Sequence, residues 1–395
     1  MDIFQSPHYV MNKRLLFYLG QWPLQTPGER RLYRSTTILL VGSILVPKLI
    51  RLVECLGNAS GIIRCLPALC IHAASAVKFF NCAMRSLTDR IREDRNGRAA
   101  FLENDILIRY AERGRRMTVA YIAYMSTALL AYLSLPLMTG LLDIVAPLNQ
   151  SRERIYLYET EYFVDQDENY FYVNLHAWIT MPFAVGILIA YDTMLAVYIS
   201  HACGIFAALG ERLESLGDPC IGDEKYIDYV RRRDETYDNV VTCIKIHKDA
   251  VEYAALIESS GYMSYLFVVG INILGITLTG FMTVTNLDQP TESLRFAAFA
   301  IAAIVSLFYP CWQGHTLMDH SQNIFSNASV RTTILFLPID TVLCVKYVHV
   351  CTRVYASTCR HSIGHIFIPH MRRAINNYGF YAYFTISVKY CILRY

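Results

Sequence analysis

Six long apolar stretches alternate with charged segments along the chain. The clearest is Phe296 to Met318, 23 residues without an acidic or basic side chain, and this is long enough to cross a hydrocarbon layer of about 30 Å. The pattern predicts an all-α, polytopic membrane protein with six clear transmembrane helices within residues 35–312. The first five helices are expected over 35–54, 62–84, 117–142, 169–209 and 259–287.

Charged segments with helical rhythm lie between these stretches and should extend outside the membrane as cytoplasmic helices. They cover 85–116, which carries nine Arg and six acids, and 204–258, which includes Arg231-Arg232-Arg233. Past residue 312, Leu317, Ser321, Ile324 and Ala328 fall on one helical face at three- and four-residue steps. This spacing predicts a further cytoplasmic helix over 313–331 that continues the sixth span.

The distribution of Lys and Arg predicts the orientation. Three segments are rich in Lys and Arg, with five in 1–34, nine in 85–116 and seven in 211–258. The intervening loops are poor in them, with none in 55–61, two in 143–168 and one in 288–295. The positive-inside rule therefore places the N-terminal segment 1–34 in the cytoplasm.

Glycosylation sequons agree with this orientation. Asn58-Ala59-Ser60 and Asn149-Gln150-Ser151 lie in two loops assigned to the outside, so we expect glycans on Asn58 and Asn149. A third sequon, at Asn327, falls inside and should be unused.

Ionisable residues in the first and fourth spans need an explanation. In the first span, Lys48 and Arg51 follow 13 uncharged residues and can extend their long side chains to the outer edge of the membrane. In the fourth span, Asp192 is the only residue among Asp, Glu, Lys and Arg. At that depth a carboxylate is either functional or paired with a neighbouring helix, and both interpretations stay open.

Composition narrows the class further. The 395 residues are 54% hydrophobic and 17% charged, against about 25% charged in soluble domains, and a net charge of +3 gives no reason to expect a nucleic-acid partner. Twelve scattered Cys form no CxxC pair, and no catalytic signature occurs, so neither a cofactor nor an enzyme activity is expected. His315, Asp319 and His320 have one-turn spacing, but such a set on a cytoplasmic helix is usually solvated, and no metal is predicted.

Short motifs follow one another in an order that resembles insect odorant receptors. The family's opening is similar to Asn12-Lys13-Arg14-Leu15-Leu16 with Gly20-x-Trp22-Pro23, and its second span to Cys65-Leu66-Pro67. After the sixth span, five residues match the family's pattern: Gly314, Leu317, Ser321, Phe325 and Ala328. The resemblance extends over roughly 330 residues of the chain. It identifies the chain as a tuning subunit of an odorant-gated cation channel.

The resemblance implies partners and a location. Four subunits surround one pore in this family, and a tuning subunit forms a hetero-oligomer with a shared coreceptor in the plasma membrane, here expected in an olfactory neuron. The anchor contacts with the coreceptor would include Gly314, Ser321, Phe325 and Ala328.

The ligand implied by the resemblance is a small volatile molecule. It needs an apolar, aromatic cavity within the bundle, with few polar groups. Any single candidate is more often explained by helix packing or lipid contact, but Trp178 and Met181 share one helical face. Residues in the outer halves of spans two to six form the predicted site: His72, Tyr132, Met138, Trp178, Met181, Ile273, Thr277, Phe281 and Phe299.

The last part of the chain, 332–395, departs from the family. A seventh helix over Thr332 to Cys351 is doubtful, because it would carry Asp340 and Lys346 inside the bilayer. The basic tail beyond it favours the cytoplasm, whereas seven crossings would end outside. We interpret this region as a variant or mis-spliced ending, and the sequence leaves open whether the chain has a pore-lining element.

Two other classes stay open. A gustatory receptor has the same inverted seven-helix topology but should end in a Thr-Tyr-x-x-x-x-x-Gln-Phe-like motif, which this C-terminus lacks. A small-molecule transporter should show internal repeats and a buried charged coupling site, for which only Asp192 qualifies. A G-protein-coupled receptor is disfavoured, because its N-terminus lies outside and its third span usually ends in Asp/Glu-Arg-Tyr.

Overall fold

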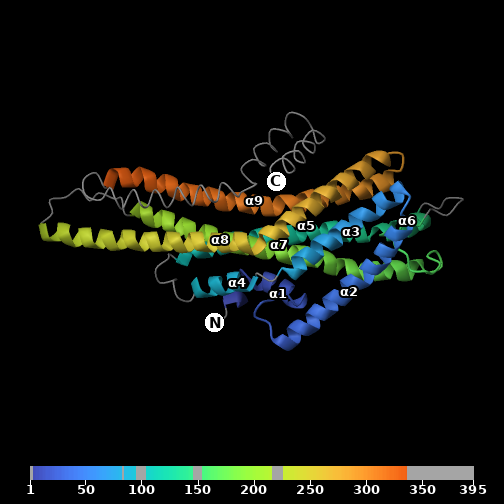
Figure 1. Cartoon of the computed structure of the whole chain (residues 1–395), viewed down its shortest axis with the longest axis horizontal. Helices are drawn as coiled ribbons and strands as arrows, with labels where there is room; N and C mark the ends of the chain where they lie inside the picture. Colours follow the sequence, from blue (N-terminus) through green and yellow to red (C-terminus); the bar gives the residue numbers. More distant parts are fainter. Residues whose placement is uncertain (1–2, 82–83, 95–103, 146–153, 216–225, 336–395) are drawn as a thin grey trace. The chain divides into compact units, whose positions relative to one another are not determined.

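A computed structural model describes residues 3–81, 84–94, 104–145, 154–215 and 226–335, and all regular structure within them is helical (Figure 1). The greater part of the doubtful seventh helix, the basic tail and Asn149 lie outside these residues. The elements are η1 (Ile3–Gln5), α1 (Val10–Tyr18), α2 (Pro27–Glu54), α3 (Ala59–Phe80), α4 (Met84–Glu93), α5 (Asn104–Leu133), α6 (Leu135–Val145), α7 (Tyr170–Ser215), α8 (Tyr226–Thr285) and α9 (Pro290–Leu335).

Five of these helices contain segments long and apolar enough to cross a membrane. The segments are Pro27–Glu54, Ala59–Phe80, Tyr170–Glu214, Asp238–Thr285 and Glu292–Ile324. They correspond to the first, second, fourth, fifth and sixth predicted spans. The prediction of an all-helical, multi-pass membrane protein is confirmed.

The third predicted span, 117–142, is two helices rather than one. The break falls at Ser134, between α5 and α6, two residues before Pro136. Pro136 has no N–H to continue the ladder, and the amide of Leu137 bonds to the carbonyl of Ser134 at 3.0 Å instead of to that of Leu133. The apolar pattern therefore located this segment correctly but could not show the interruption.

Local sequence explains how the second span begins. Asn58 precedes α3 with an extended backbone, and its side-chain oxygen accepts the amide of Gly61 at 3.4 Å, as an N-cap residue does. Prolines also occur inside α2, α3, α7 and α9, where neighbouring helices can satisfy the freed carbonyls.

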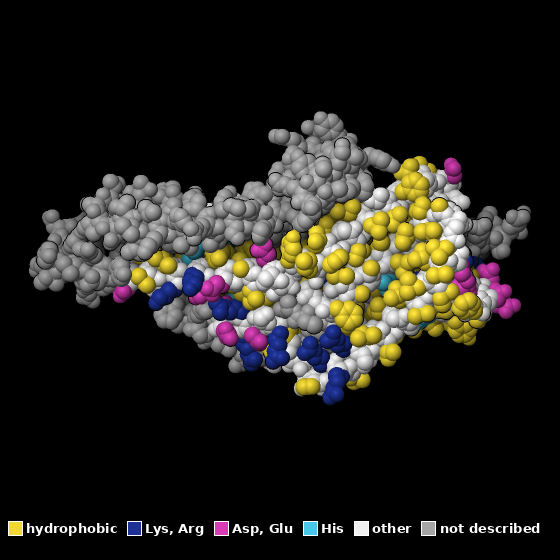
Figure 2. All heavy atoms as spheres, viewed as in Figure 1, with side chains coloured by type: hydrophobic (Ala, Val, Ile, Leu, Met, Phe, Trp, Pro, Cys, Tyr) yellow, Lys and Arg dark blue, Asp and Glu magenta, His cyan; other side chains and the backbone are white. Residues whose placement is uncertain are grey.

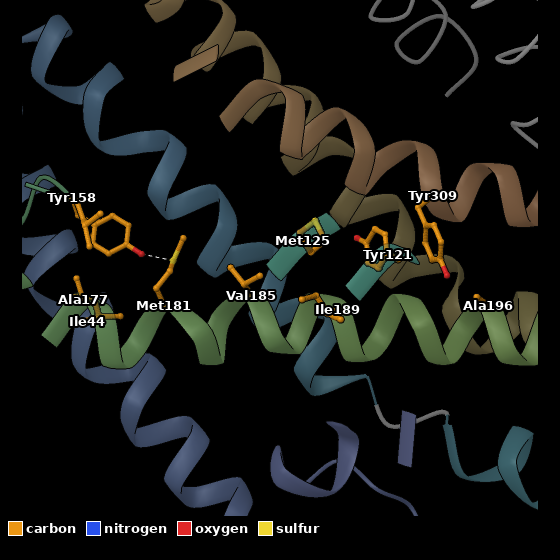
Figure 3. Packing of buried hydrophobic residues seen from close by; sticks show 11 residues of the cluster. Ile44, Tyr121, Met125, Tyr158, Ala177, Met181, Val185, Ile189, Ala196 and Tyr309 are labelled. Carbon is orange, nitrogen blue, oxygen red and sulfur yellow. Dashed lines mark hydrogen bonds between the residues drawn. The ribbon is translucent and has the colours of Figure 1, made fainter. Parts of the chain in front are cut away.

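The chain divides into two compact units, of which the first comprises Met1–His201 and Ala255–Pro310. Its core follows α7, the most enclosed candidate span, with 83% of its apolar window buried against 22–44% in the others. Figure 3 shows this core, to which α7 contributes a stripe at four-residue steps, Ala177, Met181, Val185 and Ile189. The remaining members are Ile44, Tyr121, Met125, Leu157, Tyr158, Ala196 and Tyr309.

The outer surface of the first unit is apolar over much of the face in Figure 2. On α2, for example, Leu39, Val46 and Val53 recur at seven-residue steps and are 71%, 58% and 63% exposed. A stripe of this kind is costly in water but suits contact with lipid chains.

The second unit comprises Ala202–Ala254 and Cys311–Tyr395. Within it, Phe206 packs against His247 with ring centroids 6.4 Å apart, and Met318 and Ile324 are buried. α8 is one helix of 60 residues and α9 one of 46, so the fifth and sixth spans both continue as helix into this unit. The helix predicted over 313–331 therefore forms without a break after the sixth span.

Candidate functional site

An aromatic cluster around Tyr158 brings together several of the predicted ligand residues. The ring centroid of Tyr158 lies 6.3 Å from that of His72 and 6.2 Å from that of Tyr132. Tyr132 in turn packs edge-on against Phe299 at 5.2 Å. The Tyr158 hydroxyl points to the sulfur of Met181 and bonds to it, as the dashed line in Figure 3 marks. Residues of α3, α5, α7 and α9 thus meet around one loop residue.

The loop that carries Tyr158, residues 154–169, is fastened to three helices. The amide of Glu161 donates to the carbonyl of Pro47 in α2 at 3.1 Å. The hydroxyl of Tyr132 in α5 donates to the carbonyl of Leu157. Arg295 in α9 donates to the carbonyl of Tyr156 at 3.2 Å. This loop is therefore folded onto the bundle although it is rich in acids.

Trp178 forms a hydrogen bond at the break in the third predicted span. Because the amide of Leu137 bonds to Ser134, the carbonyl of Leu133 is left without its usual helical donor. The indole N–H of Trp178 donates to this carbonyl at 3.0 Å. Trp178 and the interruption at Ser134 thus form one feature, which fixes α7 against α5 beside the aromatic cluster.

Lys48 lies in this cluster and corrects a sequence expectation. Its side chain does not reach the outer edge of the membrane but is 1% exposed, with Nζ 3.2 Å from the centroid of the Tyr158 ring and 3.4 Å from Nδ1 of His72. Arg51, one turn further on, is 38% exposed and lies 3.3 Å from Glu54 and 3.8 Å from Glu159. The difference arises because Lys48 sits on the inward face of α2 and finds an aromatic ring there.

The structure leaves part of the predicted set outside the cluster. Met138 and Phe281 are 45% and 48% exposed. Thr277 donates its hydroxyl to the carbonyl of Ile273 within its own helix, at 2.8 Å. Among the described residues, none of the predicted set lines the cavity of about 20 Å³ bounded by Asn81, Tyr191, Tyr198, Ile257 and Tyr265. The ligand set stays a prediction, centred on the members that adjoin Tyr158.

Asp192 is paired. Its Oδ1 lies 2.6 Å from Nζ of Lys78 on α3, and both side chains are no more than 1% exposed. The hydroxyl of Tyr121 donates to Oδ2 at 3.1 Å. Tyr121 is stacked on Tyr309 with centroids 4.1 Å apart, as their facing rings in Figure 3 show. Of the two interpretations left open by the sequence, the structure supports pairing.

The remaining predicted positions are described in part. Asn58 is exposed, and only its Oδ1 serves the helix cap, which leaves Nδ2 free to carry a glycan. A Cβ added to Gly314 would meet no described atom within 4 Å, and Ser321 is half-buried. The side chains of Phe325 and Ala328 lie outside the described part. No group of three or more His, Cys, Asp or Glu is placed to hold a metal among the residues that the structure describes.

Sequence reasoning missed Tyr158 and Lys48 as members of the cluster. The loop was assigned to the outside from its low content of Lys and Arg, although Ile155-Tyr156-Leu157-Tyr158 is a run of four large apolar side chains. Such a run within an otherwise polar loop was a signal that this part of the loop is buried.

These features define a multi-pass helical membrane protein with an aromatic cluster in the core of its first unit, an arrangement suited to small apolar ligands. The chain belongs to the 7tm odorant receptor family, whose sequence profile matches residues 61–328. This is a family of receptors and not a class of enzymes. No curated protein matches the chain significantly in sequence.

Two solved structures have a similar fold. One is the insect olfactory receptor OR5 from Machilis hrabei in complex with eugenol, with a TM-score of 0.66 at 13% identity. The other is the same receptor described without eugenol, with a TM-score of 0.62 at 14% identity. In both comparisons 94% of this chain and 96% of the other are covered.

Proposed function

We propose that the chain is an odorant receptor subunit that binds small volatile molecules at the Tyr158 cluster and gates a cation channel together with a coreceptor. The observation that supports this best is the cluster itself, in which four helices and a fastened loop surround aromatic and thioether side chains. One similar structure is a complex with eugenol, a small aromatic molecule, and this favours the same kind of ligand here.

Gating follows from differential affinity. A ligand that touches α3, α5, α7 and α9 together binds more tightly to one arrangement of these helices than to another. The population shifts toward the preferred arrangement by as much as the two affinities differ. Since α9 continues from the cluster to Leu335 as one helix, a change in its tilt at Phe299 is carried along the same element.

Assembly and orientation belong to the same proposal. The N-terminus and the charged helical segments lie in the cytoplasm of an olfactory neuron, and the chain crosses its plasma membrane. Gly314, Ser321, Phe325 and Ala328 contact the coreceptor in a heterotetramer. The open space at Gly314 supports this, because a partner helix can approach a position without a side chain closely.

The test is co-expression with an insect odorant coreceptor while current is recorded during application of an odorant panel. A second version should carry a standard seventh span in place of 332–395, so that a failure of the ending is separated from a failure of the receptor. We expect at least one version to give ligand-evoked cation current.

A matched pair of variants on α9 tests the site. Phe299→Ala removes an aromatic that packs on Tyr132, whereas Phe308→Ala removes one that is 47% exposed. We expect the first to shift the odorant dose–response curve by up to about 10-fold, since an aromatic contact is worth about 0.5–1.5 kcal/mol beyond the area it buries, and the second to leave it unchanged. Surface-expressed, assembled complexes that respond to nothing would refute the proposal, and substrate uptake without current would favour the transporter.

A further inference from the structure

Lys48 carries a buried amine without a carboxylate partner in the described part of the chain. Its side chain is 1% exposed, and no carboxylate oxygen of the described residues lies within 4.0 Å of Nζ. The contacts it makes are the face of the Tyr158 ring at 3.2 Å and Nδ1 of His72 at 3.4 Å. Buried lysines are normally paired with an acid, as Lys78 is with Asp192 in the same unit.

The contact with His72 does not satisfy Lys48. Nδ1 of His72 lies 2.9 Å from the carbonyl oxygen of Ala68, which can only accept, so Nδ1 carries the hydrogen. A protonated Nδ1 cannot also accept a hydrogen bond from Nζ. The same tautomer leaves Nε2 of His72 as a bare acceptor, and this buried atom has no partner. The cluster therefore holds one unmatched donor and one unmatched acceptor side by side.

The neighbouring groups supply no negative charge. Burial raises the pKa of the Tyr158 hydroxyl well above its ordinary value, so this ring stays a neutral phenol. Glu159, which follows Tyr158 in the loop, lies 3.8 Å from Arg51. His176, the other titratable side chain near Lys48, is held by Ser43 at 2.9 Å and by Tyr162 at 2.7 Å.

We propose that this site selects small carboxylic acids, with Lys48 as the group that recognises the carboxyl end. The inference rests on the proposed ligand site at Tyr158 and names the class of ligand for it. One carboxyl oxygen accepts from Nζ of Lys48, and the other faces Nε2 of His72 with the acid proton between them. A bound acid thus provides, in one functional group, an acceptor for Nζ of Lys48 and a donor for Nε2 of His72. The hydrocarbon part lies against Met181 and Phe299.

Tyr158 occupies the recognition position when no ligand is bound. Its ring covers Nζ as a cation–π partner, which stabilises an ammonium less than a carboxylate does. A carboxyl group that reaches Lys48 must displace this ring. Since the ring belongs to the fastened loop, the exchange changes the contacts of the loop with α5 and α7, through Tyr132 and Met181.

The test measures binding to the purified full chain in lipid nanodiscs, with hexanoic acid, 1-hexanol and methyl hexanoate as probes. We expect the acid to bind about 10- to 100-fold more tightly than the alcohol or the ester, the range given by two net hydrogen bonds, one at Nζ of Lys48 and one at Nε2 of His72. Lys48→Met should remove this preference and keep alcohol binding, whereas Lys48→Arg should keep part of it. The matched control is Arg51→Met, which removes an exposed cation one turn away and should change nothing.

Folding is checked by thermal melting in the same nanodiscs. Lys48→Met should melt no lower than the unchanged chain, because it removes a buried amine that has no carboxylate partner among the described residues, and Lys48→Gln serves as a second variant. An acid preference that survives both neutral variants, or tighter binding of hexanol than of hexanoic acid, overturns the inference. Failure of all three probes to bind overturns it together with the ligand site. Lys48-dependent acid binding without any current after co-expression supports the inference and refutes only the gating proposal.

Discussion

The ion pair between Lys78 and Asp192 gives the sharpest prediction for stability. Both groups lie in the bundle with almost no exposure and 2.6 Å apart, and Tyr121 donates to the second carboxylate oxygen. Each charge has lost its hydration and depends on the other. Removal of one partner alone should therefore destabilise the fold, whereas removal of both partners should not.

The single change Asp192→Asn should destabilise the fold by about 3–5 kcal/mol, because it leaves the Lys78 ammonium buried and uncompensated. This corresponds to a factor of about 100 to several thousand in the ratio of folded to unfolded chain. The double change Lys78→Met with Asp192→Leu removes both charges at similar volume. Its effect should lie between about zero and a few kcal/mol of stabilisation.

The assay is unfolding of the purified chain in mixed detergent micelles by increasing SDS, followed by circular dichroism. The control is Asp89→Asn, which breaks the pair of Arg85 and Asp89, whose side chains are 70% and 43% exposed. It should change the free energy of unfolding by about 0.5 kcal/mol or less. If the double variant is as unstable as Asp192→Asn, the explanation by an uncompensated charge is wrong. The fold would then require the two charged side chains themselves.

Three further outcomes follow from named contacts. Asn58→Gln should abolish the mobility shift that an N-glycosidase produces from this sequon, and an unchanged shift would contradict glycosylation at this exposed cap. Gly314→Leu should reduce co-purification with the coreceptor at unchanged expression, whereas Gly270→Leu, also in open space, should not; equal effects would contradict the anchor. Trp178→Phe should lower the free energy of unfolding by about 1 kcal/mol, because the carbonyl of Leu133 loses its donor, and an unchanged SDS midpoint would contradict this role.

The helices could be predicted from the sequence because a bilayer imposes a simple requirement. Every backbone group must be bonded within its own segment, so a long apolar run specifies a helix regardless of its neighbours. That is why the spans within α2, α3, α7, α8 and α9 follow from composition alone. The break at Ser134 could not be predicted in this way. The carbonyl of Leu133 that it leaves unbonded accepts from Trp178, which is 45 positions away in the chain.

The site could be predicted only in part, for the same reason. Depth in the membrane selected His72, Tyr132 and Met181, which the structure brings to one cluster. Depth cannot tell the inward face of α2 from its outward face, so Lys48 was placed at the membrane edge. Its actual partner, Tyr158, lies 110 positions later in a loop, and no local pattern connects the two.

The fastened loop has a consequence for biosynthesis. Arg295, which donates to the carbonyl of Tyr156, is added to the growing chain about 140 residues after Tyr156. Until α9 has been inserted, the loop around Tyr156 has only its hydrogen bonds to the earlier helices, such as α2 and α5. A nascent chain halted before Pro290 should therefore be cut by trypsin at Arg154 more readily than the finished protein. Maturation of the receptor would end with the closing of this segment, after the last of its described helices is in the membrane.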